Sequence, residues 1–280
     1  MTTNRRHSHR MTPKSTASKS PLIQFALLLL GLLISSGSTH ADLITLYDGN
    51  ALPGDQPWLV FAADTLSGWS QTPAAGGTQL TTNNATRAGY SNYLPLPIPS
   101  LKNNQFPTLN RSNGFALTFS SKILSESHQS TNRAGYSVIL LGHDAKGIEL
   151  GFWSNEIWAQ NSDFTHAESI SIDTAVERNY QLQIIDEQYK LLDGQNTLLS
   201  GTLRNYPTPA TPYSLPNYVF LGDNTTSAAA SVLQGPIFLQ SNLSSVPEPS
   251  TLLLLSPTAL AWYFRRSPYA LLRSITKRIT

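Results

Sequence analysis

Short runs of alternating hydrophobic and polar residues, separated by turn-forming residues, fill the chain from residue 43 to about residue 240. In Phe115–Ile123, for example, Phe115, Leu117 and Phe119 fall on one face of an extended chain, and small or polar residues fall on the other. Alternation with a period of two is typical of a β-strand with one buried face. The segment contains no convincing pattern for a helix of three turns or more, so we predict an all-β domain.

Eleven segments carry the strand pattern. They are Leu43–Tyr47, Trp58–Ala62, Phe115–Ile123, Tyr136–Leu141, Ile148–Trp153, Glu156–Gln160, Tyr180–Ile185, Tyr189–Leu192, Thr197–Leu203, Tyr218–Leu221 and Ile237–Gln240. Asp193-Gly194 between two of them is a strong signal for a tight hairpin. Ten or eleven short strands at this spacing predict a β-sandwich of the jelly-roll type.

Residues 63–113 depart from this pattern. They contain Gly76-Gly77, Asn83-Asn84 and four prolines between residues 95 and 107, with few sustained apolar runs. Such residues favour turns and loops. We predict a long loop region that packs over the sandwich, and a similar proline-rich stretch recurs at Tyr206–Pro216.

The first 41 residues have the composition of a secretory signal peptide. A basic stretch precedes the apolar run Pro21–Ile34, and small residues then lead to Ala41. This order predicts a signal peptide that is cleaved after Ala41. A retained membrane anchor is the alternative, although the run is short for a membrane span. Both Met1 and Met11 are candidate start residues, and the sequence leaves that choice open.

Residues 244–280 form a C-terminal tail of a different kind. Pro247-Glu248-Pro249 is followed by the apolar run Leu252–Phe264 and then by Arg265-Arg266. The tail resembles the PEP-CTERM sorting signal, which an exosortase recognises in the inner membrane. The resemblance implies partners in the exosortase and export machinery, transient membrane insertion, and delivery to the cell surface, the outer membrane or the medium. Because the run is shorter than the roughly 20 residues of a membrane span, a simple membrane tail is the alternative.

Charge and cysteine content narrow the possible functions of the segment between these two ends. Residues 42–245 contain nine Lys and Arg against 16 Asp and Glu, a net charge of −7. An acidic surface repels phosphate backbones, so we expect no nucleic-acid partner. The chain has no cysteine, which excludes disulfides, zinc–thiolate sites and cysteine nucleophiles.

Several strings within 42–240 resemble the choice-of-anchor Y domain, a family whose members carry different surface anchors, PEP-CTERM tails among them. The strings are Asn132–Ser137, Gly147–Trp153, Leu203–Tyr206 and Phe220–Ala228. The resemblance implies a concanavalin A-like or laminin-G-like sandwich, and it supplies no catalytic residue. Thr86–Ser91 and Asn132–Ser137 share Arg-Ala-Gly-Tyr-Ser, but their flanks differ, so we predict no internal repeat.

Enzymatic chemistry has little support in the sequence. Glucanases with a concanavalin-like fold place catalytic carboxylates at alternate positions of one strand, but Gly151 stands two residues after Glu149. Paired carboxylates for glycoside hydrolysis are therefore missing on that strand. No Gly-x-Ser-x-Gly motif is present to build a serine nucleophile elbow.

Carbohydrate binding has more support. Glu149 and Trp153 share one face of a predicted strand, and Tyr136, Trp158 and Phe164 are close in sequence. Aromatic rings beside a carboxylate suit a sugar, whose C–H groups stack on the rings while its hydroxyls bond to the acid. The alternatives are that Phe152 and Trp153 fill the core and that Glu149 forms a buried pair with Arg133.

A calcium site is the remaining candidate. Asp223 and Asn224 supply oxygen ligands in a loop between two strands, and Asp48 is a possible third ligand. A plain Asx turn explains the same residues. His166 and Glu168 have the spacing of a metal pair, but two ligands are too few.

Taken together, these patterns predict a signal peptide (1–41), a β-sandwich domain (42–243) and a sorting tail (244–280). We expect a non-enzymatic, surface-sorted protein without an obligatory cofactor that binds carbohydrate, such as exopolysaccharide or biofilm matrix. A structural or adhesive protein with protein partners is the first alternative, and a polysaccharide hydrolase is the second.

Overall fold

A computed structural model of the chain describes residues 43–95, 98–206 and 211–243. The helical parts of these ranges are two 3-10 turns, Pro53–Asp55 (η1) and Arg111–Asn113 (η2). No helix within the described ranges is long and apolar enough to cross a membrane. The predicted signal peptide with Ala41, and the predicted tail with Pro247, Glu248, Pro249, Arg265 and Arg266, lie outside the described residues.

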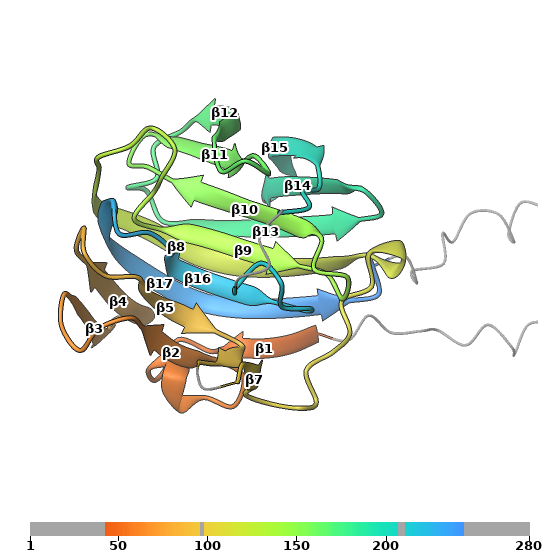
Figure 1. Cartoon of the computed structure of the whole chain (residues 1–280), viewed down its shortest axis with the longest axis horizontal. Coiled ribbons are helices and arrows are strands. Elements are labelled where there is room, and N and C mark those ends of the chain that lie inside the picture. The colour runs from red at the N-terminus through yellow and green to blue at the C-terminus, as the bar shows by residue number, and fades with distance from the viewer. Residues whose placement is uncertain (1–42, 96–97, 207–210, 244–280) are drawn as a thin grey trace, which may run out of the picture. The chain divides into compact units, whose positions relative to one another are not determined.

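An eight-stranded antiparallel sheet, sheet A, forms one layer of the domain (Figure 1). Its strands are β1 (Leu43–Tyr47), β3 (Trp69–Ala74), β4 (Gly77–Thr82), β8 (Phe115–His128), β13 (Arg178–Ile185), β14 (Gln188–Asp193), β15 (Asn196–Thr202) and β17 (Ala228–Ser241). Their order is β15-β14-β13-β8-β17-β4-β3, and β1 also pairs with β17. The two 14-residue strands β8 and β17 lie next to each other at the centre of the sheet.

A seven-stranded antiparallel sheet, sheet B, forms the other layer. Its strands are β2 (Val60–Ala63), β5 (Ala88–Ser91), β9 (Ser137–Leu141), β10 (Gly147–Phe152), β11 (Glu156–Gln160), β12 (His166–Ser171) and β16 (Val219–Asp223), in the order β12-β11-β10-β9-β16-β5-β2. A short ribbon, β6 (Tyr93–Leu94) with β7 (Ser100–Leu101), stands apart from both sheets. The chain crosses repeatedly between the sheets, and the predicted all-β, jelly-roll-type sandwich is confirmed.

The hydrophobic core lies between the sheets, because the alternating strands turn their apolar residues to the same side. Phe119 of β8 and Tyr180 of β13 meet Phe152 of β10 from the opposite sheet. The ring centroids are 5.4 Å apart for Phe119–Tyr180, 5.5 Å for Phe152–Tyr180 and 6.1 Å for Phe119–Phe152. Edge-to-face and tilted pairs at this spacing add to the free energy gained by burying the rings.

The predicted long loop at residues 63–113 is wrong, because this region contributes β3, β4 and β5 to the two sheets. β4 has the sequence Gly-Thr-Gln-Leu-Thr-Thr, in which Leu80 is the only large apolar side chain. β12, which the sequence also did not reveal, has partly exposed residues along its whole length. β3 and β12 are edge strands of their sheets. Because an edge strand needs fewer buried apolar residues than a central strand, the alternation of apolar and polar residues in its sequence is weak.

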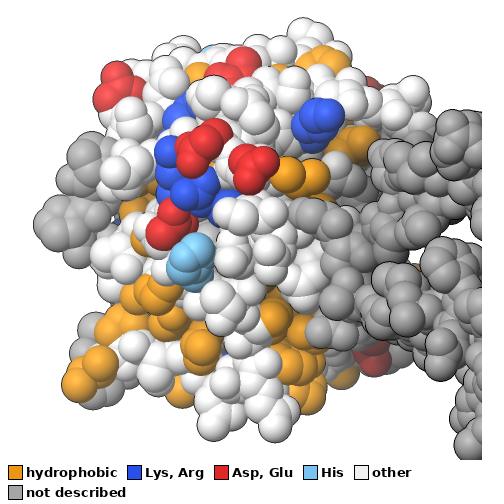
Figure 2. Space-filling model, turned by 90° about the vertical axis from the view of Figure 1, so that its right-hand side faces the viewer, with side chains coloured by type: hydrophobic (Ala, Val, Ile, Leu, Met, Phe, Trp, Pro, Cys, Tyr) orange, Lys and Arg blue, Asp and Glu red, His pale blue; other side chains and the backbone are white. Residues whose placement is uncertain are grey.

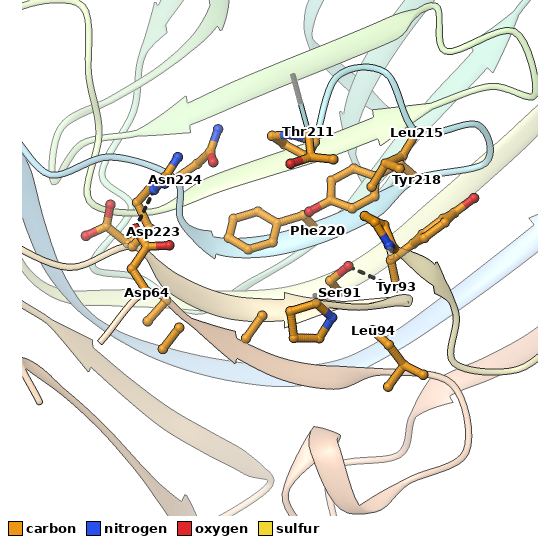
Figure 3. A pocket seen from close by; sticks show the side chains of 17 residues that line it. Asp64, Ser91, Tyr93, Leu94, Thr211, Leu215, Tyr218, Phe220, Asp223 and Asn224 are labelled. Atoms are coloured by element: carbon orange, nitrogen blue, oxygen red, sulfur yellow. Dashed lines mark hydrogen bonds and ion pairs between the residues drawn. The ribbon is translucent and has the colours of Figure 1, made fainter. Parts of the chain in front are cut away.

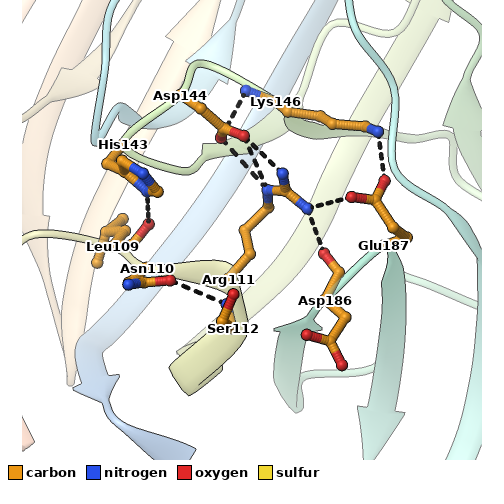
Figure 4. A network of polar contacts seen from close by, with 9 residues as sticks. All are labelled: Leu109, Asn110, Arg111, Ser112, His143, Asp144, Lys146, Asp186 and Glu187. Atoms are coloured by element: carbon orange, nitrogen blue, oxygen red, sulfur yellow. Dashed lines mark hydrogen bonds and ion pairs between the residues drawn. The ribbon is translucent and has the colours of Figure 1, made fainter.

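A network of charged side chains joins three turns at one end of the sandwich (Figure 4). Arg111 of η2 bonds to Asp144 of the β9–β10 turn at 2.6 Å and to Glu187 of the β13–β14 turn at 2.7 Å. Glu187 also contacts Lys146. Figure 2 shows basic and acidic side chains gathered on this end of the domain. Arg111 and Glu187 are next to strands of sheet A, and Asp144 and Lys146 lie in a turn of sheet B, so these ion pairs link the two sheets at this end.

Candidate functional site

The central strands of sheet B are buried on both faces, and polar groups collect on the outer face. Ile148 and Leu150 of β10 point into the core, so Glu149 between them points outward. Ile139, Leu141 and Phe220 also lie on the outer face, where they pack against Tyr206 and other residues outside the strands. The described parts of the 204–218 segment cover this face.

Several hydrogen bonds fix the covering segment to the sheet. Arg204 exchanges two backbone hydrogen bonds with Gly147, of 2.7 and 3.1 Å. The Tyr206 hydroxyl accepts the Glu149 backbone N–H at 2.9 Å. At the other end of the segment, the backbone N–H of Asn217 donates to the Gly142 carbonyl at 2.9 Å. The segment therefore takes the place that β11 occupies farther along β10.

A cavity of about 260 Å³ opens between this segment and the sheet, and we call it the Glu149 pocket. Its lining in the described part of the chain consists of Arg87, Arg133, Ala134, Ser137, Glu149, Gln160, Phe164, Thr211, Pro212, Tyr213, Asn224 and Thr225. Glu149 is 3% exposed. Its carboxylate accepts a hydrogen bond from the Tyr213 hydroxyl, which in turn accepts one from Asn224 Nδ2 at 2.8 Å.

Burial of Glu149 raises the pKa of its carboxyl group above the ordinary value. The hydroxyls of Tyr213 and Ser137 and the positive charge of Arg133 act in the opposite direction without cancelling the effect. Loss of hydration disfavours the charged form of a buried acid, whereas donors and cations favour it. The carboxyl group of Glu149 is therefore protonated more readily than that of an exposed glutamate, and the hydroxyl groups of Tyr213 and Ser137 lie within hydrogen-bonding reach of it.

Arg133 and Gln160 also line the Glu149 pocket. Arg133 Nη1 donates to the carbonyls of Asn132 and Phe164 at 3.0 and 3.2 Å, and its guanidinium carbon lies 5.4 Å from the centre of the Phe164 ring. Gln160 Nε2 donates to the same Phe164 carbonyl at 2.8 Å. Donors and one aromatic ring thus point into the pocket beside the Glu149 carboxyl group.

A second cavity, of about 380 Å³, adjoins the first, and we call it the aromatic pocket (Figure 3). The two cavities share Arg87, Thr211, Pro212 and Asn224. The rings of Tyr218 and Phe220 lie nearly parallel, at an interplanar angle of 7° with centroids 6.4 Å apart, and both line the aromatic pocket. Figure 3 shows these two rings above β16, with Asp223 and Asn224 at the far end of the strand.

The proposed calcium ligands, Asp223 and Asn224, have other partners. Asp223 is fully buried, and its two carboxylate oxygens lie 2.7 Å from Thr82 Oγ1 and 2.9 Å from the backbone nitrogen of Thr225. Burial raises the pKa of Asp223 to about 8. Within residues 43–95, 98–206 and 211–243, no set of three or more His, Asp and Glu side chains is arranged to hold a metal ion.

The structure separates the predicted aromatic residues from Glu149. Tyr136 is 1% exposed in the core between the sheets, where its hydroxyl donates to Gln234 Oε1 at 2.5 Å. Tyr136 is thus not part of an outer-face site. Tyr136 lies opposite Phe152, whose backbone N–H donates to the Tyr136 carbonyl, and both side chains therefore point into the core.

Trp153 and Trp158 are on the outer face, but neither is among the described residues that line the Glu149 pocket. Trp158 is 1% exposed, and its indole lies over Gly151, where a Cβ atom would come within 2.6 Å of the ring. Trp153 stacks on His128 at 4.2 Å with an interplanar angle of 10°. The two tryptophans and His128 form a separate aromatic cluster. The alternative that Phe152 and Trp153 both fill the core is therefore right for Phe152 and wrong for Trp153.

Sequence reasoning missed Tyr206, Tyr213 and Gln160. Tyr213 lies 64 residues from Glu149 in the chain and Tyr206 lies 57 residues away, so neither could be connected with Glu149 from local sequence. Arg133 was considered as an ion-pair partner of Glu149, and the structure places it in the same pocket.

No protein-family model matches this chain, and no curated protein matches it, so the resemblance to choice-of-anchor Y domains stays a prediction. Among solved structures, the chain is similar to a carbohydrate esterase from the Shiga toxin-encoding bacteriophage phi24B, with 12% identity and a TM-score of 0.43 over 65% of this chain and 90% of that one. A protein of unknown function from Shewanella oneidensis is 12% identical, with a TM-score of 0.41 over 84% and 98% of the two chains. Domain 4 of a GH43 extracellular arabinanase from Geobacillus stearothermophilus, in complex with arabinotriose, is 14% identical, with a TM-score of 0.36 over 65% and 82%. Similarity of this order carries no information about ligand or activity.

Proposed function

We propose that the sandwich is a non-catalytic carbohydrate-binding module and that the Glu149 pocket is its binding site. The observation that carries the proposal is the convergence of Glu149, Gln160 and Asn224 with the rings of Phe164 and Tyr213 around one cavity. A sugar offers hydroxyls to such polar groups and C–H faces to such rings. A volume of about 260 Å³ is below the roughly 300–1,000 Å³ of sites for drug-sized ligands, and it suits one sugar ring.

Binding rather than hydrolysis is favoured by the acids that line the pocket. Glu149 is the only Asp or Glu in its described lining. Most glycoside hydrolases need two carboxyl groups across the scissile bond, about 5–5.5 Å or 6.5–9.5 Å apart. Glu149 is also engaged by Tyr213, which suits a hydrogen-bonding role toward hydroxyl groups.

We also propose that the module is exported and sorted to the cell surface, as the two ends of the sequence predict. Cleavage after Ala41 and near Pro247-Glu248-Pro249 would leave the sandwich as the mature product. The ligand of the pocket is then a polysaccharide outside the cell, such as exopolysaccharide or the biofilm matrix. Mass spectrometry of the mature protein from its host tests this. A product that keeps residues 1–41 and the tail would contradict it.

The binding proposal is tested with the full-length chain in mild detergent, on a glycan array and against host exopolysaccharide. We expect saturable binding that Glu149→Gln and Asn224→Ala each weaken about tenfold or more, which corresponds to about 1.4 kcal/mol. Glu177→Gln is the matched control, because Glu177 bonds to Ser120 on sheet A and lies outside both pockets. Binding that all three variants retain would place the site elsewhere, and no binding to any glycan would point to protein partners instead.

A further inference from the structure

The two Arg-Ala-Gly-Tyr-Ser segments, residues 87–91 and 133–137, lie on either side of one strand. Leu221 of β16 pairs with Tyr90 of β5 on one side and with Val138 of β9 on the other. Because β16 is antiparallel to both, the two segments run in the same direction across sheet B. Two short strings that are far apart in the chain therefore flank the same strand in parallel, offset from each other by two residues.

Both copies use the same alternation of inward and outward residues. Tyr90 and Tyr136 point into the core, and their hydroxyls donate to glutamine side chains, Gln71 at 3.0 Å and Gln234 at 2.5 Å. The serine that follows each tyrosine is on the outer face, where Ser91 lines the aromatic pocket and Ser137 lines the Glu149 pocket.

The glycine of each copy is required by close packing. A Cβ atom at Gly89 would lie 2.6 Å from the Phe220 ring, and one at Gly135 would lie 2.2 Å from the backbone of Ala229. The arginine of each copy lies just before its strand, Arg87 directly before β5 and Arg133 four residues before β9. Arg87 and Arg133 both line the Glu149 pocket.

The two guanidinium groups have capacity for a ligand. Arg133 uses Nη1 for two backbone carbonyls, and its Nε and Nη2 have no hydrogen-bond partner in the described part of the chain. Arg87 pairs with Asp64 at 2.6 Å, but both side chains are about half exposed, at 52% and 42%. An exposed pair of this kind contributes about 0–1 kcal/mol and is readily exchanged for another anion.

We propose that the sugar bound in the Glu149 pocket is acidic, and that Arg87 and Arg133 together bind its carboxylate. The inference rests on the proposed function and names its ligand as a uronic acid within an acidic polysaccharide. Guanidinium groups match a carboxylate with two parallel N–H···O bonds. Glu149, Gln160 and Asn224 then face the hydroxyls of the same sugar ring.

The acidity of the rest of the domain makes this a local interaction. Residues 42–245 carry a net charge of −7, so long-range attraction does not bring an acidic polymer to the surface. Affinity must come from contacts of the two arginines, and removing either should have a large effect. A generic loss of positive charge elsewhere on the domain should have a small one.

The test measures binding of the full-length chain, in mild detergent, to polygalacturonate, alginate and hyaluronan, each compared with its carboxyl-reduced form. We expect at least one acidic polymer to bind at least tenfold more tightly than its reduced form. Arg87→Gln and Arg133→Gln should each remove most of that difference. Arg133→Lys, which keeps the charge but loses the planar fork, should fall between the wild type and Arg133→Gln.

Arg178→Gln is the matched control, because Arg178 also pairs with an aspartate, Asp193 at 2.7 Å, but on sheet A. It should change the affinity less than twofold. An effect as large as that of Arg133→Gln would show nonspecific charge attraction and overturn the inference. Equal binding of acidic and reduced polymers, or binding of neutral glycans alone, would overturn the inference and leave the proposed function standing. No binding to any glycan would overturn both.

Discussion

Both faces of sheet B are buried along its central strands, but by different kinds of structure. The inner face packs against sheet A, and the two sets of alternating side chains fill the space between them with rings and aliphatic groups. The outer face is covered by an irregular segment, whose described parts are residues 204–206 and 211–218, and two cavities of about 260 and 380 Å³ remain there.

The polar groups of the two faces differ in the same way. On the inner face, the Tyr136 hydroxyl donates to Gln234, and Tyr136 borders neither of the two cavities. On the outer face, Glu149, Tyr213 and Asn224 form a chain of hydrogen bonds that borders open space. A sheet that meets a second sheet is packed uniformly, whereas one that meets a loop leaves room for a ligand.

The largest expected effect comes from truncating one aromatic residue on each face. Phe152 is fully buried between the sheets, and Phe152→Ala should lower the free energy of unfolding by about 3–5 kcal/mol. Phe220 lies on the other face and borders the aromatic pocket, so Phe220→Ala removes fewer contacts and should cost less than about 3 kcal/mol. Denaturant unfolding measures both losses. Equal losses would mean that the outer face is packed as tightly as the inner one.

A smaller and pH-dependent effect is expected at Asp223, which lies at the end of β16 that borders the aromatic pocket. Its pKa is about 8 in the folded protein against 3.8 for a free side chain. The folded state therefore binds one more proton than the unfolded state between about pH 4 and pH 8, and the free energy of unfolding falls as the pH rises through this window.

Asp223→Asn should remove this contribution. The amide cannot ionise, and its Nδ2 can donate to Thr82 Oγ1 as a protonated acid would. We expect the variant to match the wild type near pH 5 and to exceed it by up to about 4 kcal/mol at pH 9. Asp163→Asn serves as the control, because its pKa is lowered by Thr165 and its loss should bring no gain at pH 9. A wild type and Asp223→Asn that differ equally at both pH values would show that Asp223 does not titrate between pH 5 and pH 9 in the folded protein, and would contradict the prediction.

The sequence predicted the central strands well and the site poorly, and the two outcomes have one physical cause. Strands such as Glu156–Gln160 are specified by neighbours two residues apart, so their pattern can be read locally. The Glu149 pocket depends on Tyr213, which comes from 64 residues away and is placed by the register of the whole sheet. Tyr136 was named as a site candidate because it is close to Glu149 in the sequence, and the face it points to becomes known only when β9 is paired with β10.

The smallest change that separates the two faces is the removal of a single hydroxyl group from each. Tyr213→Phe and Tyr136→Phe should each lower the free energy of unfolding by about 1 kcal/mol, since each deletes a hydrogen bond to one side-chain acceptor. Only Tyr213→Phe should weaken glycan binding, because the Tyr213 hydroxyl bonds to both Glu149 and Asn224. Without it, these two side chains lose the contact that fixes their positions in the pocket. Thermal unfolding and glycan titration of the two variants measure both quantities. A loss of affinity in Tyr136→Phe as large as that in Tyr213→Phe would show that binding depends on the rigidity of the whole sandwich and not on the outer face of sheet B.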